Sequence, residues 1–401
     1  MRILQLCNKP PWPPIDGGSK AMHNITRGLL SAGHQVKVLC ISTAKQPLDP
    51  GSVPPDFMRA TRMEGVFVDT AINVVDALSD LLTADNYNIS RFFSPDMDIR
   101  LIRLLSEEKF DIVQLESLFM TPYIATIRRY SKARIVLRSH NLEHLIQARI
   151  ASGERNIIKR PYRRYLAKQL EDYEMAVLDR VDGVAAISPS DSKHFRAHGT
   201  RTPVVSIPFG VDPAEYPSDP IDPNRAPAFF HLGSMDWLPN EEGIRWLLES
   251  VWPKVIRKQP KAQLHLAGNK MPADLLRVDM QGVQVKDRVK NAVSYMHKYQ
   301  VMVVPLFSAG GMRVKIIEGM AMGKTVVSTP IGAEGIACTD GKDILLATTA
   351  QEFAEHLIAL HGDPERATAI GKAARKLVLR SYADAPIVED LSAFYKRLLK
   401  A

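Results

Sequence analysis

Residues 301–336 have the sequence VMVVPLFSAGGMRVKIIEGMAMGKTVVSTPIGAEGI, and this stretch predicts the fold of the chain. Residues 301–306 are apolar without interruption and rich in β-branched side chains, which is typical of a parallel strand covered on both faces. Gly310 and Gly311 permit a sharp turn, and residues 312–322 are helix formers followed by another glycine. We therefore predict a strand, a glycine turn, a helix and a second strand.

The charged residues of the predicted helix are unusually placed. Arg313 and Lys315 lie in its first turns, where the helix dipole disfavours positive charge. Glu318 is surrounded in sequence by apolar residues, so its carboxylate is expected to be buried and to need a partner. A bound anion at the helix N-terminus and a polyol such as ribose at Glu318 would satisfy both requirements. The alternative is an ordinary pair between Lys315 and Glu318 on a solvated helix face.

Composition limits the class of protein. The chain has 401 residues, a length that favours two domains. Its three cysteines, Cys7, Cys40 and Cys338, are not at metal-ligand spacing, which argues against a zinc site or a disulfide framework and favours a reducing compartment. No apolar run has the roughly 18 residues that span a bilayer, and the N-terminal residues predict a strand rather than a signal peptide. The net charge of +8 favours anionic partners, but basic and aromatic residues do not alternate, so nucleic acid is not expected among them.

Paired glycines follow the first predicted strand. A strand at 3–7, a helix at 20–32 and a strand at 35–41 form a β-α-β unit, with Gly17 and Gly18 in the loop before the helix. Open α/β sheets bind ligands at this end of a strand, although the spacing is not that of a dinucleotide-binding motif. A tight turn and a ligand-binding loop are both open interpretations.

His140 follows another predicted strand. Strands at 111–116 and 134–139 alternate with a helix at 121–130, so His140 is expected at the carboxyl edge of the sheet. Polar residues at that edge of a parallel sheet face its ligands. A structural role and a ligand-binding role are both compatible with this position.

Residues 155–168 are strongly basic. Six cations occur here with no acidic residue between them, namely Arg155, Lys159, Arg160, Arg163, Arg164 and Lys168. Such a segment can lie on an anionic membrane surface or contact a lipid phosphate. A helix face that is exposed only to water is the alternative.

A proline-rich segment divides the chain. Residues 208–227 contain six prolines and no apolar periodicity, which predicts a linker between domains at 1–207 and 228–384. The β-α alternation resumes after it with a strand at 228–232 and a helix at 241–256. The alternation in both halves predicts an α/β protein with two doubly wound parallel sheets.

Several further motifs carry a family resemblance. They are ISPSD at 187–191, IPFGVD at 207–212, FHLGSMDWLPNEEGI at 230–244, LHLAGN at 264–269 and, most specifically, the segment at 303–336. With the paired glycines and the strand-end histidine, they make the chain resemble the retaining glycosyltransferases of family 4, also called group 1, over essentially its whole length. The resemblance implies the GT-B fold, in which two Rossmann-like domains face each other across a cleft. It also implies that the C-terminal helix, 385–401, returns to the N-terminal domain, which lies on the acceptor side, while the C-terminal domain binds a nucleotide-sugar.

The resemblance assigns roles to the predicted helix of the C-terminal domain. Glu318 matches the glutamate that holds the ribose hydroxyls of the nucleotide-sugar. Arg313 and Lys315 match the cations of a GxRxK subgroup, which neutralise the donor diphosphate. Backbone amides that assist them are those of Gly310, Gly311 and Met312.

The resemblance assigns further roles outside that helix. His140 matches the histidine that contacts the donor sugar. Gly17 and Gly18 are expected to approach the phosphate or the acceptor. Val283 and Val285 lie where such enzymes hold the nucleotide base.

Two departures from the family pattern concern the donor. Family members commonly have a second glutamate at the position that is Gly310 here, which bears on the choice of donor sugar. Many members also have an arginine and a lysine in the loop after the first strand of the second domain, where this chain has Ser234 and Asn240. A diphosphate still needs compensation in a closed site. Arg313 and Lys315 are the available replacements, so we expect that the charge has moved from one loop to another.

The resemblance therefore implies a hexosyltransferase-type enzyme that moves a sugar from a nucleotide-sugar to an acceptor hydroxyl with retention, in polysaccharide or glycoconjugate assembly. It implies no cofactor, because the nucleotide-sugar is a co-substrate. No metal is expected either, because Arg313, Lys315 and the helix N-terminus would stabilise the diphosphate and no Asp-x-Asp motif lies at a predicted strand end of the cleft. A sugar or a lipid-linked glycan is the expected acceptor, and the cytoplasm, at the inner face of the membrane, is the expected location. The alternatives are a non-catalytic nucleotide-sugar-binding scaffold, suggested by Gly310, and a nucleotide-sugar epimerase.

Overall fold

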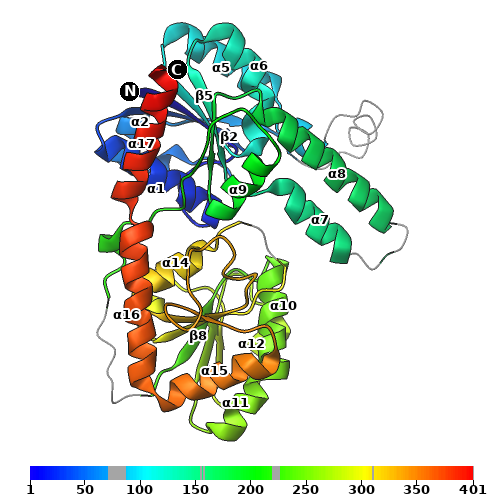
Figure 1. Ribbon diagram of the computed structural model, residues 1–401, viewed down its shortest axis with the longest axis vertical. Coiled ribbons are helices and arrows are strands. Elements are labelled where there is room, and N and C mark those ends of the chain that lie inside the picture. The colour runs from blue at the N-terminus through cyan, green and yellow to red at the C-terminus, as the bar shows by residue number, and fades with distance from the viewer. Residues whose placement is uncertain (71–86, 154–155, 157–158, 219–225, 309–310, 401) are drawn as a thin grey trace. The chain divides into compact units, whose positions relative to one another are not determined.

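The chain forms two compact units. The computed structural model describes residues 1–70, 87–153, 156, 159–218, 226–308 and 311–400. The first unit consists of residues 1–210 and 384–401, and the second of residues 211–383 (Figure 1). The described part of the proline-rich segment after Gly210 therefore belongs to the second unit.

The first unit contains a seven-stranded parallel sheet in the order β3-β2-β1-β4-β5-β6-β7. The strands are β1 (Arg2–Cys7), β2 (Gln35–Ser42), β3 (Glu64–Phe67), β4 (Ile112–Glu116), β5 (Arg134–Ser139), β6 (Gly183–Ala186) and β7 (Val204–Ser206). Strands β1, β4 and β5 are buried along nearly their whole length, as their apolar sequences predict. The sequence does not predict the edge strands β3 and β7, because they are short and partly exposed.

Helices cover both faces of this sheet. The α-helices of the unit are α1 (Gly17–Ser31), α2 (Pro55–Thr61), α4 (Tyr87–Ser90), α5 (Pro95–Glu107), α6 (Ile124–Tyr130), α7 (Glu143–Gly153), α8 (Lys159–Leu178), α9 (Pro189–Ala197) and α17 (Asp384–Lys400). Helices α1 and α17 enclose one core, whereas α5, α6, α8 and α9 contribute to the other. The contact between α1 and α17 depends on Gly28, where a Cβ would lie 2.3 Å from Val388 Cγ2. The C-terminal helix thus completes the first unit.

The second unit contains a six-stranded parallel sheet in the order β10-β9-β8-β11-β12-β13. The strands are β8 (Phe229–Leu232), β9 (Leu264–Ala267), β10 (Val283–Lys286), β11 (Val301–Val304), β12 (Thr325–Ser328) and β13 (Leu345–Leu346). Two parallel sheets with helices confirm the predicted α/β class.

The helices of the second unit differ in detail from the prediction. They are α10 (Leu238–Trp246), α11 (Trp252–Lys258), α12 (Ala273–Leu276), α13 (Ala292–Met296), α14 (Val314–Ala321), α15 (Ala350–Gly362) and α16 (Pro364–Ser381). The predicted helix over 241–256 lies within a helical segment from Leu238 to Lys258, in which a π-helical turn, Leu247–Val251, joins α10 to α11. The predicted helix over 312–322 is shorter and begins at Val314.

Each sheet has one point at which the strand order reverses. It lies between β1 and β4 in the first unit and between β8 and β11 in the second. Loops that leave two such strands at their carboxyl ends run in opposite directions, which opens a crevice where α/β proteins bind ligands. The topology therefore marks one candidate site in each unit.

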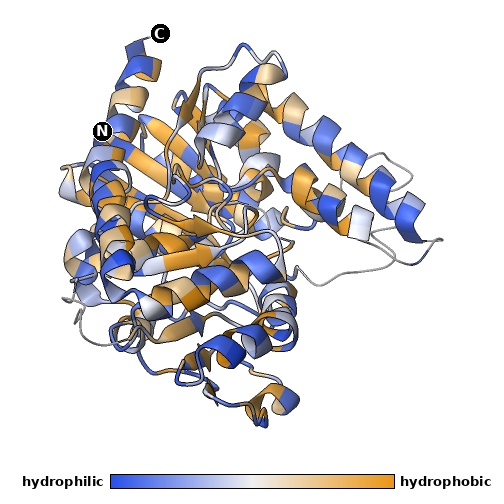
Figure 2. Ribbon diagram, turned by 60° about the horizontal axis from the view of Figure 1, so that its bottom comes forward, coloured by the Kyte–Doolittle hydropathy of each residue, from blue (hydrophilic) through white to orange (hydrophobic). Residues whose placement is uncertain are grey.

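Hydropathy follows the layers. The strands of both units are predominantly hydrophobic, and the helices carry hydrophilic residues on part of their surface (Figure 2). Within the described residues, no helix combines the length and the apolar character that a membrane crossing requires.

Candidate functional site

The loops that leave β8 and β9 approach each other very closely in the second unit. A Cβ on Gly268 would lie 1.8 Å from the Gly233 carbonyl oxygen, so that only glycine fits there. Gly233 itself has three polar groups around it, because a Cβ at that position would meet Asn240 Nδ2 and Lys315 Nζ at 2.7 Å and His231 Nε2 at 3.0 Å. Three polar side chains therefore surround the main chain of Gly233 at the carboxyl end of β8.

Lys315 brings positive charge from α14 to the loop after β8. Its Nζ donates a hydrogen bond to Asn240 Oδ1 at 2.7 Å, and Asn240 Nδ2 donates to the Ser234 carbonyl oxygen at 2.8 Å. Burial and then the charge of Arg313 lower the pKa of Lys315 to about 7, although Glu318 acts in the opposite sense. The Lys315 ammonium thus lies beside the two positions, Ser234 and Asn240, that are uncharged in this chain.

The sequence predicts Arg313 in the first turn of α14, but it lies just before the helix as its N-cap residue. Its side chain is buried and donates to the Gly311 carbonyl oxygen, and its guanidinium lies 5.9 Å from the centre of the Trp237 ring. Gly311 has a φ of +70°, which favours glycine. Met312 is buried, and Gly310 lies outside the described residues.

Glu318 is buried, as the apolar character of its helix predicts. Its side chain is 4% exposed, so the alternative of a surface pair with Lys315 on a solvated face is wrong. Tyr216 donates its hydroxyl hydrogen to Glu318 Oε1 at 2.8 Å. Sequence reasoning missed Tyr216, because it lies in the proline-rich segment and 102 residues away.

His231 is a second residue that sequence reasoning missed. Its Nδ1 lies 2.8 Å from the Val303 carbonyl oxygen, which fixes the proton on Nδ1. Burial and then the charge of Lys315 lower the pKa of His231 well below its usual value. Among the described residues, the buried Nε2 of His231 has no hydrogen-bond partner, so the cluster contains a neutral acceptor beside a cation.

Two other predicted donor residues of this unit are less informative. Ser234 Oγ donates to Asp236 Oδ1 at 2.6 Å. Val285 lies on the edge strand β10, half-buried against the hydrophobic core. Their roles in binding stay predictions.

In the first unit, Gly17 and Gly18 are the first residues of α1. The expected start of this helix at residue 20 is wrong, because Asp16 caps the helix earlier by accepting hydrogen bonds from the Gly18 and Ser19 amides. Lys9 Nζ lies 2.6 Å from Asp16 Oδ1. A cation missed by the sequence analysis therefore lies at this helix start.

His140 lies at the outer end of a buried charged cluster. Its Nε2 is 2.6 Å from Glu116 Oε2, and Arg138 Nη1 is 3.3 Å from the same oxygen. Burial raises the pKa of Glu116, but Arg138, His140 and Gln5 outweigh it and hold that pKa at about 2. Burial lowers the pKa of His140, although Glu116 opposes this effect. The structure thus pairs the predicted histidine with an ionised carboxylate.

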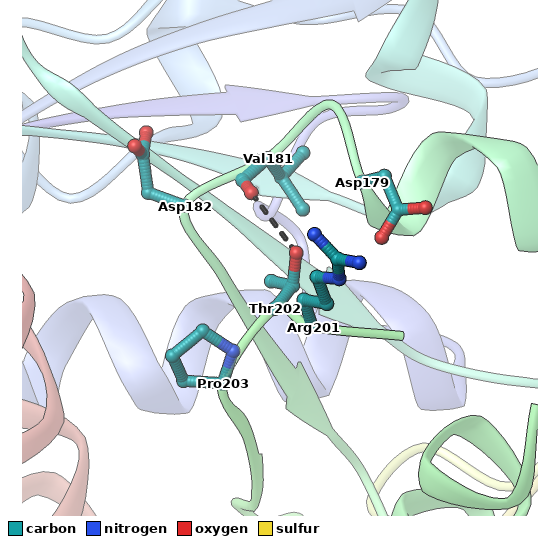
Figure 3. Close-up of a pocket in the computed structure, with 6 residues that line it drawn as sticks. All are labelled: Asp179, Val181, Asp182, Arg201, Thr202 and Pro203. Atoms are coloured by element: carbon teal, nitrogen blue, oxygen red, sulfur yellow. Dashed lines mark hydrogen bonds between the residues drawn. The ribbon is translucent and has the colours of Figure 1, made fainter. Parts of the chain in front are cut away.

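A pocket of about 630 Å³ lies elsewhere in the first unit (Figure 3). Its lining includes Asp182 and Pro203, which immediately precede β6 and β7. It therefore opens at the amino-terminal edge of the sheet, opposite the edge that His140 follows. We give this pocket no part in the candidate site, because ligands of such sheets bind at the carboxyl edge.

The basic segment occupies the start of α8, which pairs with α7 in a helical hairpin (Figure 1). Every residue from 159 to 165 is exposed, including Tyr162 and Tyr165 at 47% and 49%. Lys168 pairs with Glu171 and Asp172 at 3.2 and 3.1 Å. Arg155 lies outside the described residues.

Comparison with known proteins gives the family context. Residues 15–215 match the family model for Glycosyltransferase Family 4, and residues 226–363 match the model for Glycosyl transferases group 1. An uncharacterized 44.6 kDa protein in the cps region of Klebsiella pneumoniae is 22% identical over 377 residues, which are 89% of this chain and 90% of that protein.

Solved structures share the fold. A sucrose-phosphate synthase from Thermosynechococcus elongatus superposes with a TM-score of 0.72 at 16% identity, over 100% of both chains. HepE from Anabaena in complex with UDP-glucose gives a TM-score of 0.64 at 14% identity, over 99% of this chain and 100% of that one. A variant of TarM from S. aureus in complex with fondaparinux, α-GlcNAc-glycerol and UDP gives 0.65 at 11% identity, over 98% and 100%.

Proposed function

This chain belongs to the family 4, or group 1, glycosyltransferases, and we propose that it transfers a hexose from a nucleoside-diphosphate donor to an acceptor hydroxyl with retention of configuration. The observation that carries the proposal is the pair of cations, Arg313 and Lys315, at the switch point of the second sheet. When the bond between the anomeric carbon and the diphosphate breaks, the leaving group gains negative charge. Cations that are already fixed in place stabilise this charge without reorganisation, and we propose that they do so without a metal ion.

The other residues each have a proposed role in binding the donor. Glu318 accepts hydrogen bonds from ribose hydroxyls in competition with Tyr216, and the amides of Gly311 and Met312 bind phosphate oxygens. His140 binds a hydroxyl of the transferred sugar. The acceptor oxygen attacks the anomeric carbon on the face that the diphosphate leaves, and the acceptor proton passes to the departing phosphate oxygen. Atoms and charge balance without a further reactant.

Two relatives support particular choices of substrate. HepE was solved with UDP-glucose, which makes uridine diphosphate sugars the first donors to test. The Klebsiella relative is named for a cps region, which supports a role in polysaccharide assembly. The three cysteines are free, which supports the cytoplasmic location that we propose.

The test of the donor site compares Arg313→Ala and Glu318→Ala with the native chain. Each is expected to lower turnover of the nucleotide-sugar by about 100-fold or more. For Arg313, this is the size of the loss when one group that stabilises the leaving charge is removed. For Glu318, the loss follows because the donor is no longer held in the correct position. Lys342→Ala, an exposed cation of the same unit, is the matched control and should leave turnover unchanged. Native-like turnover in both site variants would refute the assignment.

Measurements of binding and turnover together separate the alternative functions. A thermal-shift panel identifies the donor, since a ligand at about 100 times its Kd stabilises the folded state by about 2.7 kcal/mol. Binding without transfer to any acceptor would favour the scaffold, and conversion of the donor without an acceptor would favour the epimerase. Retention is read from the anomeric configuration of the product by NMR.

We also propose that the start of α8 contacts an anionic membrane that carries a lipid-linked acceptor. Its exposed residues combine four cations with two tyrosines, the side chains that favour a membrane interface. The cations are Lys159, Arg160, Arg163 and Arg164. Since each cation near an anionic surface contributes about 1 kcal/mol, replacing all four with Gln should weaken vesicle binding by roughly 1,000-fold.

Flotation with anionic and with neutral vesicles tests this contact. Lys168→Gln is the control, because Lys168 already pairs with two carboxylates and should contribute little. If the native chain fails to float with anionic vesicles, α8 is an ordinary exposed helix and the membrane proposal is wrong, whereas the proposed transfer reaction is unaffected.

A further inference from the structure

A chain of buried polar groups crosses one core of the first unit and ends at His140. Tyr395 of α17 donates its hydroxyl hydrogen to Gln114 Oε1, and Gln114 Nε2 donates to Glu116 Oε1. Gln5 Nε2 donates to the same carboxylate oxygen at 2.8 Å. The side chains of Glu116 and His140 are 0% and 10% exposed, so the chain runs from the buried helix α17 to the edge of the sheet.

The register of the sheet explains this alignment. Gln5 and Gln114 are partners across β1 and β4, and Glu116 and Arg138 are partners across β4 and β5. Partners in a parallel sheet point to the same face, and residues two apart on a strand do so as well. The four polar residues therefore lie together on one face of the sheet, and Tyr395 packs in the core on that face.

The hydrogen bonds of this chain have a single direction. An ionised carboxylate can only accept hydrogen bonds, so both glutamines must present their NH₂ groups to Glu116. Gln114 then turns its oxygen away, and the Tyr395 hydroxyl donates to that oxygen. Tyr395 consequently fixes the orientation of the Gln114 amide.

The same pattern of donors and acceptors determines which nitrogen of the His140 imidazole carries the proton. If Nε2 were unprotonated, its lone pair would face Glu116 Oε2 at 2.6 Å, which is repulsive, and could accept only from Arg138 Nη1 at 3.3 Å. If Nε2 carries the proton, it donates to Glu116 over the shorter distance, and Arg138 donates to the same oxygen at 3.3 Å. The shorter contact decides for a proton on Nε2.

We propose that Tyr395, acting through Gln114 and Glu116, is a positioning residue that holds His140 as the tautomer protonated on Nε2. The Nδ1 lone pair is then the hydrogen-bond acceptor of the ring. Its ligand is a hydroxyl that donates a hydrogen bond. This identification rests on the proposed function: the ligand is a hydroxyl of the donor sugar. The C-terminal helix would then determine which hydrogen bond His140 offers to that sugar.

NMR of the free protein tests the tautomer without any substrate. Protein labelled on histidine with ¹³C and ¹⁵N reports the tautomer from the imidazole shifts, and His140→Gln identifies the signals among the 11 histidines. We expect the Nε2–H form near neutral pH. An Nδ1–H form or an imidazolium at His140 would overturn the proposal, whether or not the chain is a glycosyltransferase.

Tyr395→Phe tests the relay. Removing the hydroxyl leaves the Gln114 amide free to turn, so an Nδ1–H population or exchange broadening should appear at His140. Tyr173→Phe is the matched control, because it also removes a hydrogen bond of this unit, that to Thr121 at 2.7 Å, away from the chain. Gln114→Met interrupts the relay with Tyr395 intact, in case Tyr395→Phe does not fold. Unchanged His140 signals in a folded relay variant would overturn the role of Tyr395.

Kinetics supplies a separate readout. Tyr395→Phe should lower kcat/KM for the nucleotide-sugar by about 10-fold to 100-fold, the range for a misplaced contact group. Its Kd for the nucleoside diphosphate should not change, because that ligand lacks the transferred sugar whose hydroxyl His140 would bind. An equal loss in both quantities would indicate general damage and contradict the proposal. If the native chain shows no transfer at all, the proposed function fails while the tautomer result still stands.

Discussion

Donor binding should depend on pH through Lys315. In the free protein, burial and then Arg313 lower the pKa of Lys315 to about 7 from the ordinary value of 10.5. A bound diphosphate adds negative charge beside the ammonium and is expected to return the pKa towards the ordinary value. The complex therefore holds a proton that the free protein loses above about pH 7, so the affinity should fall as pH rises.

The size of the effect follows from the two pKa values. With about 7 for the free protein and the ordinary value of 10.5 taken for the complex, the Kd should rise by about 25-fold between about pH 6.5 and 8.5, or about 1.9 kcal/mol. His231 does not contribute in this window, because its own pKa lies well below 6.5. Folding stability should depend on pH in the opposite direction. Above about pH 7, Lys315 keeps its proton in the unfolded chain but loses it in the folded one, so the free energy of unfolding of the empty protein should rise with pH.

Isothermal titration calorimetry measures this dependence. A nucleotide-sugar is the preferred ligand, because a free terminal phosphate titrates near pH 6 and would add its own proton. Titrations in two buffers of different ionisation enthalpy count the protons taken up on binding. Lys315→Met should bind weakly with no pH dependence, and Lys315→Arg, which is always charged, should also be flat. A constant Kd for the native chain across this range would refute the reasoning.

Two further predictions concern stability. Tyr216→Phe should lower the free energy of unfolding by about 1.5–3 kcal/mol in urea, because buried Glu318 loses a charged hydrogen bond of 2.8 Å; an unchanged midpoint would show that another group replaces the hydroxyl. Gly243→Ala should cost about 1–3 kcal/mol through overpacking, because a Cβ would lie 1.9 Å from the Pro305 carbonyl oxygen, whereas Gly362→Ala, with its nearest neighbour at 3.6 Å, should be tolerated. Equal melting temperatures for these two glycine variants would contradict the close approach of Gly243 to Pro305.

The sequence was a good guide to the sheets but a poor one to their edges. Buried parallel strands such as β11 are recognisable because burial on both faces requires apolar residues to follow one another in the sequence. An edge strand such as β3 pairs on one side only and alternates between half-buried and exposed residues, so its sequence resembles that of a loop. The helix starts also moved, because caps such as Asp16 depend on side-chain hydrogen bonds.

For the site, the sequence predicted residues but not their partners. Lys315 and Glu318 are recognisable from the local sequence. Lys315 is a cation near a helix N-terminus, and Glu318 is a carboxylate among apolar residues. Asn240 and Tyr216 lie 75 and 102 residues away from them, and only the folded unit brings them into contact. A signal for the partner of His140 did exist, because Glu116 is a charged residue at the end of a strand that the sequence predicts, and the structure buries it completely.

The position of Lys315 explains how one loop can lose its cations without losing its charge. Its Nζ fills the space beside Gly233 that any larger residue would occupy, and it hydrogen-bonds to Asn240, a residue without charge. A second cation at Asn240 would face Lys315 at hydrogen-bond distance and repel it. A cation in the loop at Asn240 and a cation on α14 at Lys315 therefore exclude each other. This chain has the lysine on α14 and neutral side chains in the loop. Because the lysine is largely removed from water, its charge is also the more easily lost, which makes donor binding in this arrangement sensitive to pH near neutrality.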